Sequence, residues 1–185
     1  SNFGFANRIA ITAQVRAAVR KVLREASLRL PLLYDCAHVS IKLEEWRGEK
    51  LWIHRHGASR ALPPSLCGEH PVFAHTGQPV PIPGSMGHAS FIGVADEGAS
   101  ESFCSVNHGA GRVLDKPEAE AQFTAAEVEA EMRAKNIRLY RYGSDNIAEQ
   151  APSSFKDISQ VIRAMQALRL AKPVVRLRPV AVLKG

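Results

Sequence analysis

Proline is concentrated in one stretch of the chain, and this concentration limits what the middle of the sequence can form. More than half of the eleven prolines lie within residues 57–84. Proline donates no backbone hydrogen bond and fixes its own φ, so it interrupts helices and central strands. We therefore predict a long loop with little regular structure over residues 57–84, with the regular elements on either side of it.

The segment before this loop shows a helical pattern followed by two strand-like runs. Apolar residues recur at helical spacing over residues 6–28, and the more polar side carries basic residues: Arg16, Arg20, Lys21 and Arg24. A solvated basic face is the simpler interpretation of that side, and a nucleic-acid contact is the alternative. After Pro31, the runs HVSIKLEEW and KLWIHRH are divided by RGE, which predicts a β-hairpin.

The segments after the loop alternate between strand and helix patterns. Strands are predicted for the apolar runs ASFIGVA, SFCSVN and IRLYRY and for the alternating run PVVRLRPVAVLKG. Thr124 and Glu127 have the spacing of a capping box at the start of TAAEVEAEMRA, and DISQVIRAMQALRL has one apolar helical face. With no internal repeat or linker, the sequence predicts one α+β (mixed α/β) domain with a β-sheet core and flanking helices.

Charge and cysteine content narrow the class of protein. The net charge of +6 makes anionic partners plausible without naming them. Cys36, Cys67 and Cys104 show no C-x-x-C spacing, so we predict reduced thiols in a cytoplasmic protein. No apolar run approaches the length of a membrane span and no secretory leader is recognised, which predicts no membrane association.

The segment SVNHGAGR places His108 between an asparagine and a Gly-Ala-Gly run that ends at Arg112. The glycines allow the backbone close to a bulky polar group, and the guanidinium suits phosphate. His108 is the group in this segment able to act as a nucleophile or base near neutral pH. A loop histidine is the simpler interpretation from this motif alone, because it lacks P-loop and dinucleotide-binding spacing.

A second glycine-rich segment, PIPGSMGHASF, carries Ser85 and Ser90 on either side of Gly87. Hydroxyl groups and free backbone N–H groups in such a loop suit the phosphates or the polar edge of a nucleotide. A tight turn between strands is the alternative.

Three short segments contain groups that can bind metals. Asp35, Cys36 and His38 in YDCAHVS fit manganese or zinc, with a structural histidine near a turn as the simpler alternative. The runs HRH and CGEH suggest a structural zinc site, which we disfavour because neither belongs to a paired arrangement.

Together these segments resemble one family, the RtcB-type tRNA-splicing ligases. The resemblance rests on FANR, YDCAHVSIK, HRHGASRA, PVPIPGSMGHASFI, SFCSVNHGAGR, APSSFKDISQVI and RLRPVAVLKG, which occur in the family's order. It covers nearly the whole chain, residues 1–185, and corresponds to about the C-terminal half of the catalytic domain of such a ligase.

The resemblance implies a GTP- and manganese-dependent RNA ligase that joins 2′,3′-cyclic phosphate or 3′-phosphate ends to 5′-hydroxyl ends, in tRNA splicing or RNA repair. His108 matches the histidine that attacks the α-phosphorus of GTP and becomes guanylylated. His38 matches a manganese ligand. The matching nucleotide-binding positions are Ser85, Ser90, Asn107, Gly109, Ala110, Gly111, Arg112, Phe155 and Lys184. The implied partners are RNA ends, GTP and an archease-like activator.

The chain also departs from the family. Phe155 stands where tyrosine is frequent, His56 where lysine is usual, and Asp115-Lys116 where serine-arginine is usual. Arg55 and Arg60 are further candidate contacts for anions. The family's other manganese ligands have no counterpart here, so we expect this chain to be inactive alone and not to hold two manganese ions. The alternatives are a non-catalytic homologue that binds RNA ends or a protein partner, and a metal phosphoesterase that uses His38, His54 and His56.

Overall fold

The computed structural model describes residues 2–143 and 146–184 and contains both helices and small sheets, which confirms the predicted α+β class. The chain divides into two compact units, Ser1–His56 and Gly57–Gly185, here called unit 1 and unit 2. Within the described ranges, none of the helices is long and apolar enough to cross a membrane.

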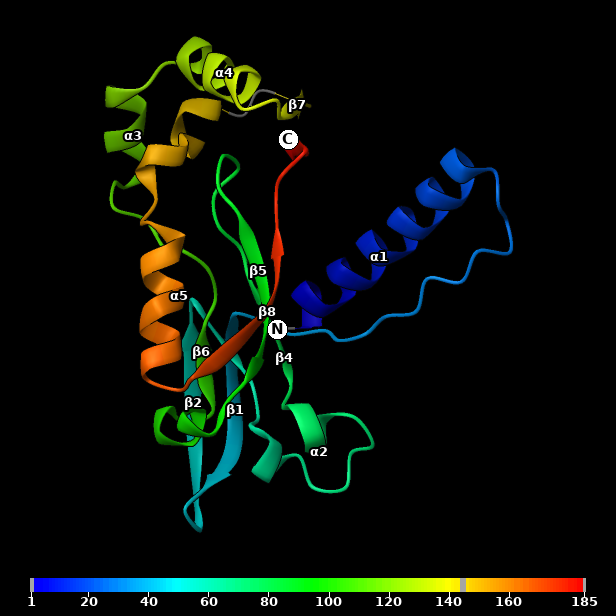
Figure 1. The fold of residues 1–185 in the computed structure, drawn as a ribbon, viewed down its shortest axis with the longest axis vertical. Helices are drawn as coiled ribbons and strands as arrows, with labels where there is room; N and C mark the ends of the chain where they lie inside the picture. Colours follow the sequence, from blue (N-terminus) through cyan, green and yellow to red (C-terminus); the bar gives the residue numbers. More distant parts are fainter. Residues whose placement is uncertain (1, 144–145, 185) are drawn as a thin grey trace. The chain divides into compact units, whose positions relative to one another are not determined.

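Unit 1 consists of one helix and one hairpin (Figure 1). The helix α1 (Asn2–Leu23) ends earlier than the predicted residues 6–28, because Arg24 takes a positive φ of 55°. The strands β1 (Val39–Trp46) and β2 (Glu49–His56) confirm the predicted hairpin. Arg47 and Gly48, both with positive φ, form its two-residue turn, which suits the twist of paired strands.

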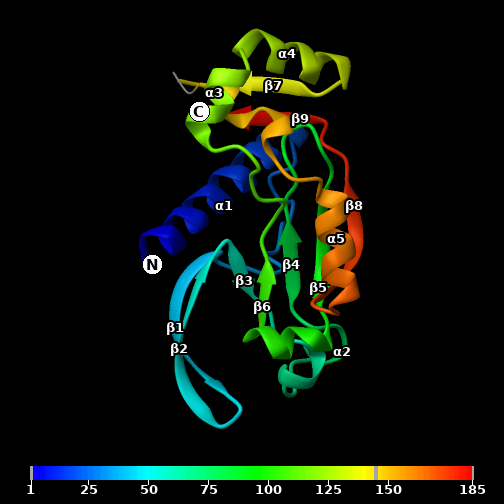
Figure 2. The same ribbon diagram turned by 90° about the vertical axis from the view of Figure 1, so that its left-hand side faces the viewer.

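The described residues of unit 2 form three sheets, whose strands are labelled in Figure 2. A three-stranded antiparallel sheet has the order β4-β5-β8, from Pro79–Ile82, Ser90–Ala95 and Ala171–Leu177. The short strands β3 (Ala58–Arg60) and β6 (Ser105–Asn107) pair antiparallel. The strands β7 (Arg138–Arg141) and β9 (Ala181–Lys184) pair in parallel.

Four α-helices accompany these sheets in the described part of unit 2, and two of them pack on apolar clusters. The four helices are α2 (Phe73–Thr76), α3 (Lys116–Gln122), α4 (Ala125–Ala134) and α5 (Ile158–Ala167). Short 3₁₀ segments complete the unit at Pro64–Leu66, Glu97–Ser102, Ile147–Gln150 and Pro152–Ser154. The first cluster forms where α5 packs on the three-stranded sheet, and the second lies under α4. The predicted helices over residues 124–134 and 157–170 are confirmed.

Three predictions about unit 2 were wrong. Residues 57–84 are not one long loop, since they contain β3, α2 and β4; Pro79 and Pro81 are tolerated because β4 lies at the edge of its sheet. Only the end of SFCSVN is a strand, because a 3₁₀ segment runs to Ser102 and two residues with positive φ follow it. The C-terminal run forms two strands in different sheets, interrupted before Ala181.

Candidate functional site

His108 directly follows β6, and the neighbouring strand β3 holds it in place. β6 pairs with β3 in the register Ala58↔Asn107 and Ser59↔Val106. One residue beyond that ladder, the backbone N–H of His108 donates to the carbonyl of Gly57 at 3.0 Å. The side-chain Oγ of Ser59 lies 3.3 Å from Nδ1 of the half-buried His108 ring. The candidate nucleophile is therefore fixed on both its backbone and its ring.

The loop that follows His108 is tied to the second glycine-rich segment. The amide of Asn107 donates to the carbonyl of Gly109 at 2.7 Å, and the N–H of Ala110 donates to the carbonyl of Pro83 at 3.0 Å. Gly109 has φ +103°, and a Cβ at that position would lie 2.9 Å from the Pro83 oxygen. Gly111 has φ +71° with open space where a Cβ would stand. The two predicted glycine-rich segments are thus in direct contact.

Ser85 and Ser90 lie in the segment that begins at Pro83. The Oγ of Ser90 accepts a hydrogen bond from the N–H of Gly84 at 3.2 Å, which closes this turn. The Oγ of Ser85 lies 2.7 Å from Nδ1 of His88. Ala110 is hydrogen-bonded to Pro83, so this turn follows directly after a residue that contacts the His108 loop.

Arg112 connects this loop to the segment before α5. Its guanidinium donates to the carbonyls of Leu114 at 2.8 Å and Glu149 at 2.7 Å and lies 4.9 Å above the ring of Phe155. Arg112 and Phe155 also form an isolated antiparallel bridge. Arg112 in this structure thus orders the loop, and Phe155 supports its guanidinium through a cation–π contact.

Lys184 and Glu149 both line a small cavity of unit 2. The ammonium group of Lys184 donates to Oε1 of Gln150 at 3.4 Å. Lys116 pairs with Glu149 at 2.7 Å, and this hydrogen bond holds the pKa of the glutamate carboxyl below its usual value. The cavity has a volume of about 300 Å³, and its lining is Lys116, Asn146, Ile147, Glu149, Gln150, Leu183 and Lys184.

His38 lies in unit 1 and is exposed. It lines a cavity of about 640 Å³ together with Arg8, His54, Arg55 and His56. Hydrogen bonds from Arg8 hold the pKa of the Asp35 carboxyl below its usual value, so this carboxylate is committed to an ion pair. Arg55, predicted as an anion contact, is buried and binds Glu44 through two hydrogen bonds of 2.7 and 2.9 Å.

No group of three or more histidine, cysteine or acidic side chains is arranged to hold a metal ion in residues 2–143 and 146–184. The segments HRH and CGEH belong to these residues, so neither is part of such a group. In the latter, burial raises the pKa of the Cys67 thiol, while the ring of His70 stacks on Phe73 at 4.1 Å. The described residues therefore do not fit a manganese or zinc centre. None of the three cysteines is joined in a disulfide.

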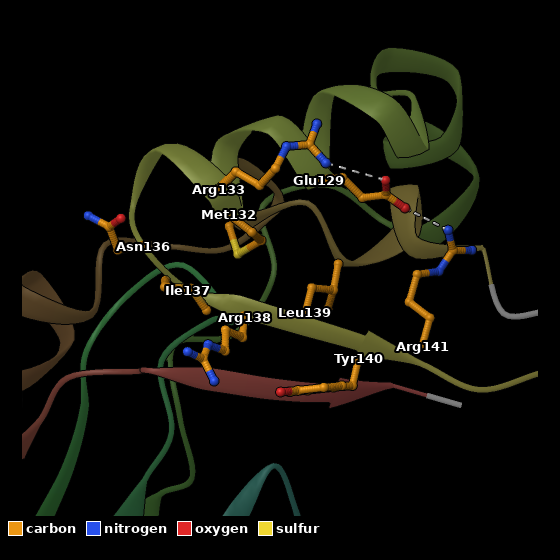
Figure 3. A pocket seen from close by; sticks show the side chains of 9 residues that line it. All are labelled: Glu129, Met132, Arg133, Asn136, Ile137, Arg138, Leu139, Tyr140 and Arg141. Atoms are coloured by element: carbon orange, nitrogen blue, oxygen red, sulfur yellow. Dashed lines mark hydrogen bonds and ion pairs between the residues drawn. The ribbon is translucent and has the colours of Figure 1, made fainter.

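A larger cavity, of about 760 Å³, lies between α4 and β7 and contains none of the predicted site residues (Figure 3). Glu129 lies between two arginines there, 3.8 Å from Arg133 and 2.9 Å from Arg141. Both ion pairs are drawn in Figure 3, where the side chains of Arg138 and Tyr140 extend from β7 toward β9. Arg133 and Arg141 of this cavity are thus partly neutralised by Glu129.

Sequence reasoning missed three residues of the site: Ser59, Glu149 and Gln150. Ser59 reaches His108 only through a strand pairing that spans more than forty residues of sequence. Glu149 and Gln150 lie in a 3₁₀ segment that no periodic pattern indicated.

Comparison with known proteins gives one consistent result. The family model described as tRNA-splicing ligase RtcB matches residues 1–185. Relatives named tRNA-splicing ligase RtcB from Nanoarchaeum equitans, Pyrobaculum aerophilum and Pyrococcus furiosus are 42%, 39% and 38% identical over the whole of this chain. The chain spans 40% of the length of the first two relatives and 20% of the third.

Proposed function

Because the chain belongs to the tRNA-splicing ligase RtcB family, we propose that it forms part of the catalytic domain of a GTP-dependent RNA ligase with His108 as its nucleophile. The observation that carries the proposal is the seating of His108. Its ring is fixed beside Ser59, and its loop is anchored on Pro83, next to a second glycine-rich turn with two serine hydroxyl groups. This combination supplies a nucleophile and a phosphate-compatible loop in one place.

The proposed first step is attack by the neutral imidazole of His108 on the α-phosphorus of GTP. A nitrogen–phosphorus bond forms, the bond from the α-phosphorus to the bridging oxygen breaks, and pyrophosphate leaves. The open space at Gly111 and the backbone amides of the loop favour close approach of the phosphate. Ser85, Ser90, Asn107, Gly109 and Ala110 are the proposed surroundings of the guanylate.

In the second step, an oxygen of the RNA 3′-phosphate attacks the guanylate phosphorus, and the nitrogen–phosphorus bond breaks. The RNA 5′-hydroxyl then attacks the activated 3′-phosphorus, GMP leaves, and a phosphodiester bond forms. A 2′,3′-cyclic phosphate must first be hydrolysed to the 3′-phosphate. Phe155, Arg112 and Lys184 are proposed nucleotide contacts, with Lys184 placed at the polar cavity beside Gln150.

The resemblance implies manganese, and the described residues of this chain do not form a manganese site by themselves. His38 is proposed as one ligand, and the family's other manganese ligands have no counterpart in this chain. Because those ligands are missing, we expect the chain alone not to join RNA ends. The other proposed partners are RNA ends and an archease-like activator. We propose the cytoplasm as the location, since cysteines without disulfide bonds are typical of reducing compartments.

The test uses GTP labelled at the α-phosphate and the whole protein that carries this chain, in the presence of manganese. We expect an acid-labile label that maps to His108 and disappears in the His108→Ala variant. His75→Ala, which removes an exposed histidine of α2, is the control and should keep the label. If no label forms while RNA still binds with a steep salt dependence, the protein is an RNA-end binder and the ligase proposal is wrong.

A further inference from the structure

We propose that Ser59 is a positioning residue for His108: its Oγ accepts a hydrogen bond from Nδ1–H of the imidazole and so leaves the lone pair of Nε2 for attack on phosphorus. This inference rests on the proposed function, because it assigns the tautomer and the attacking atom of the same nucleophile. Nothing in the His108 motif itself indicates Ser59, which lies about fifty residues earlier in the sequence.

The strand register explains why the two side chains meet. Ser59 stands opposite Val106 in the β3–β6 pair, and Val106 belongs to the apolar core. Side chains alternate between the faces of a strand, so His108 continues on the face of Val106, toward which Ser59 also points. The separation of 3.3 Å between Oγ and Nδ1 agrees with this geometry. Nε2 is on the opposite edge of the ring.

The proposed chemistry decides which atom donates. Attack by Nε2 requires its lone pair, so the proton of the neutral ring is on Nδ1. The side-chain oxygen that the structure brings to Nδ1 is Oγ of Ser59, at 3.3 Å, and it can accept this proton in a hydrogen bond. Ser59 is only 1% exposed, so water competes little for this contact.

The hydrogen bond from Nδ1–H of His108 to Oγ of Ser59 stabilises the transition state as well as the ground state. When Nε2 bonds to phosphorus, positive charge develops on the ring, and Nδ1–H becomes a stronger donor to Oγ. A preorganised acceptor at that position stabilises the charge without reorganisation of solvent. A hydroxyl that instead donated to Nδ1 would place the proton on Nε2 and block the attacking atom.

The experiment compares Ser59→Thr with Ser59→Val, which have nearly the same shape and differ in the hydroxyl group. Nitrogen-15 NMR of this chain distinguishes the two imidazole tautomers, and a His108→Gln spectrum identifies the signals of His108 among those of seven histidines. We expect the Nδ1–H tautomer in the unsubstituted chain and in Ser59→Thr. We expect a shift toward the Nε2–H tautomer, which free histidine side chains favour in water, in Ser59→Val.

In the whole protein, the single-turnover rate of guanylylation should be nearly retained in Ser59→Thr and should fall about 10- to 100-fold in Ser59→Val, with GTP binding unchanged. Ser59→Ala replaces Ser59→Val if the latter fails to fold. An Nε2–H tautomer in the unsubstituted chain, or equal rates for the Thr and Val variants, would overturn the role of Ser59. An expected tautomer with no adduct on His108 would instead overturn the proposed function.

Discussion

The two units of the chain differ in what they bury. Unit 1 contains a single buried residue among residues 2–56, and that residue is charged: Arg55. Its helix exposes large apolar side chains, with Phe3 at 89% and Val22 at 78%. Unit 2 has two apolar clusters, which include the fully buried Ile82 and Met132, and its one buried charged residue among those described is Asp96.

The two units are therefore stabilised by different kinds of interaction. Burial of apolar surface drives folding, and unit 2 obtains it from its own residues. Unit 1 has regular elements that are closed by backbone hydrogen bonds and ion pairs, while its apolar side chains remain exposed. All the proposed nucleotide contacts and His108 lie in unit 2, so the candidate site is built on the unit that has a core.

The largest effect is expected for the buried ion pair of unit 1. Arg55→Met leaves the Glu44 carboxylate without its bidentate partner and should lower the free energy of unfolding of the hairpin by about 3–5 kcal/mol. The double variant Arg55→Met/Glu44→Met should recover most of this loss. Both tryptophans, Trp46 and Trp52, lie in the hairpin, so urea unfolding followed by tryptophan fluorescence reports on unit 1. Equal losses in the single and double variants would contradict a buried pair.

A second prediction contrasts one apolar residue from each unit. Met132→Ala removes a fully buried side chain from the cluster under α4 and should cost about 2–5 kcal/mol of stability. Ile41→Ala truncates a side chain of β1 that is 61% exposed and should change stability by less than about 0.5 kcal/mol. Urea denaturation followed by far-UV circular dichroism measures both. If the two variants cost the same, the apolar face of unit 1 is packed and the contrast between the units fails.

Local patterns were sufficient to predict α1, α4, α5 and the hairpin. Thr124 and Glu127 cap α4 as their spacing predicted, and α5 buries the periodic residues Ile158, Ile162 and Met165. The missed helix α3 also has a capping box, from Asp115 to Glu118, which sequence reasoning could have found. These elements are local because their stabilising contacts lie within one or two turns of sequence.

The pairings between distant segments could not be predicted in the same way. β3 meets β6, and β8 and β9 enter different sheets, through contacts that no local spacing encodes. For the site, the glycine-rich motifs predicted the two segments that the structure joins at Pro83 and Ala110. The partner of His108 depended on the register of β3 against β6, so Ser59 was invisible to motif reasoning.

A third prediction tests whether the loop that follows His108 is as rigid as the rest of unit 2. Gly109→Ala forces a positive φ on a residue with a side chain and brings Cβ to 2.9 Å from the Pro83 oxygen. We expect a loss of about 1–3 kcal/mol in thermal or urea unfolding. Gly111→Ala, the matched control, meets open space and should cost about 1 kcal/mol from its positive φ alone. If Gly109→Ala lowers the free energy of unfolding no more than Gly111→Ala does, the loop can move away from the Pro83 oxygen and is not rigid.

The smallest effect concerns Asp96, the buried charge of unit 2. Burial acts to raise the pKa of its carboxyl, but the N–H of Glu97 and the cations of Lys172 and Arg169 outweigh it and lower the pKa below the usual value. Asn at this position can still accept the capping hydrogen bond from Glu97, so Asp96→Asn removes the charge and keeps the cap.

Lys172 and Arg169 lie 3.2 and 3.7 Å from Asp96 and are themselves largely exposed, so solvent screens both pairs. We expect Asp96→Asn to lose about 0.2–1 kcal/mol at neutral pH. Because the folded pKa is lowered, the contribution of the carboxylate is fully present above its ordinary pKa of about 3.9 and is lost as pH falls through the folded value. Urea unfolding at neutral pH and at about pH 2 should therefore show the variant's deficit shrinking with acid. A deficit that persists at low pH would show that Asp96 acts through packing, as the apolar residues of unit 2 do, and not through its charge.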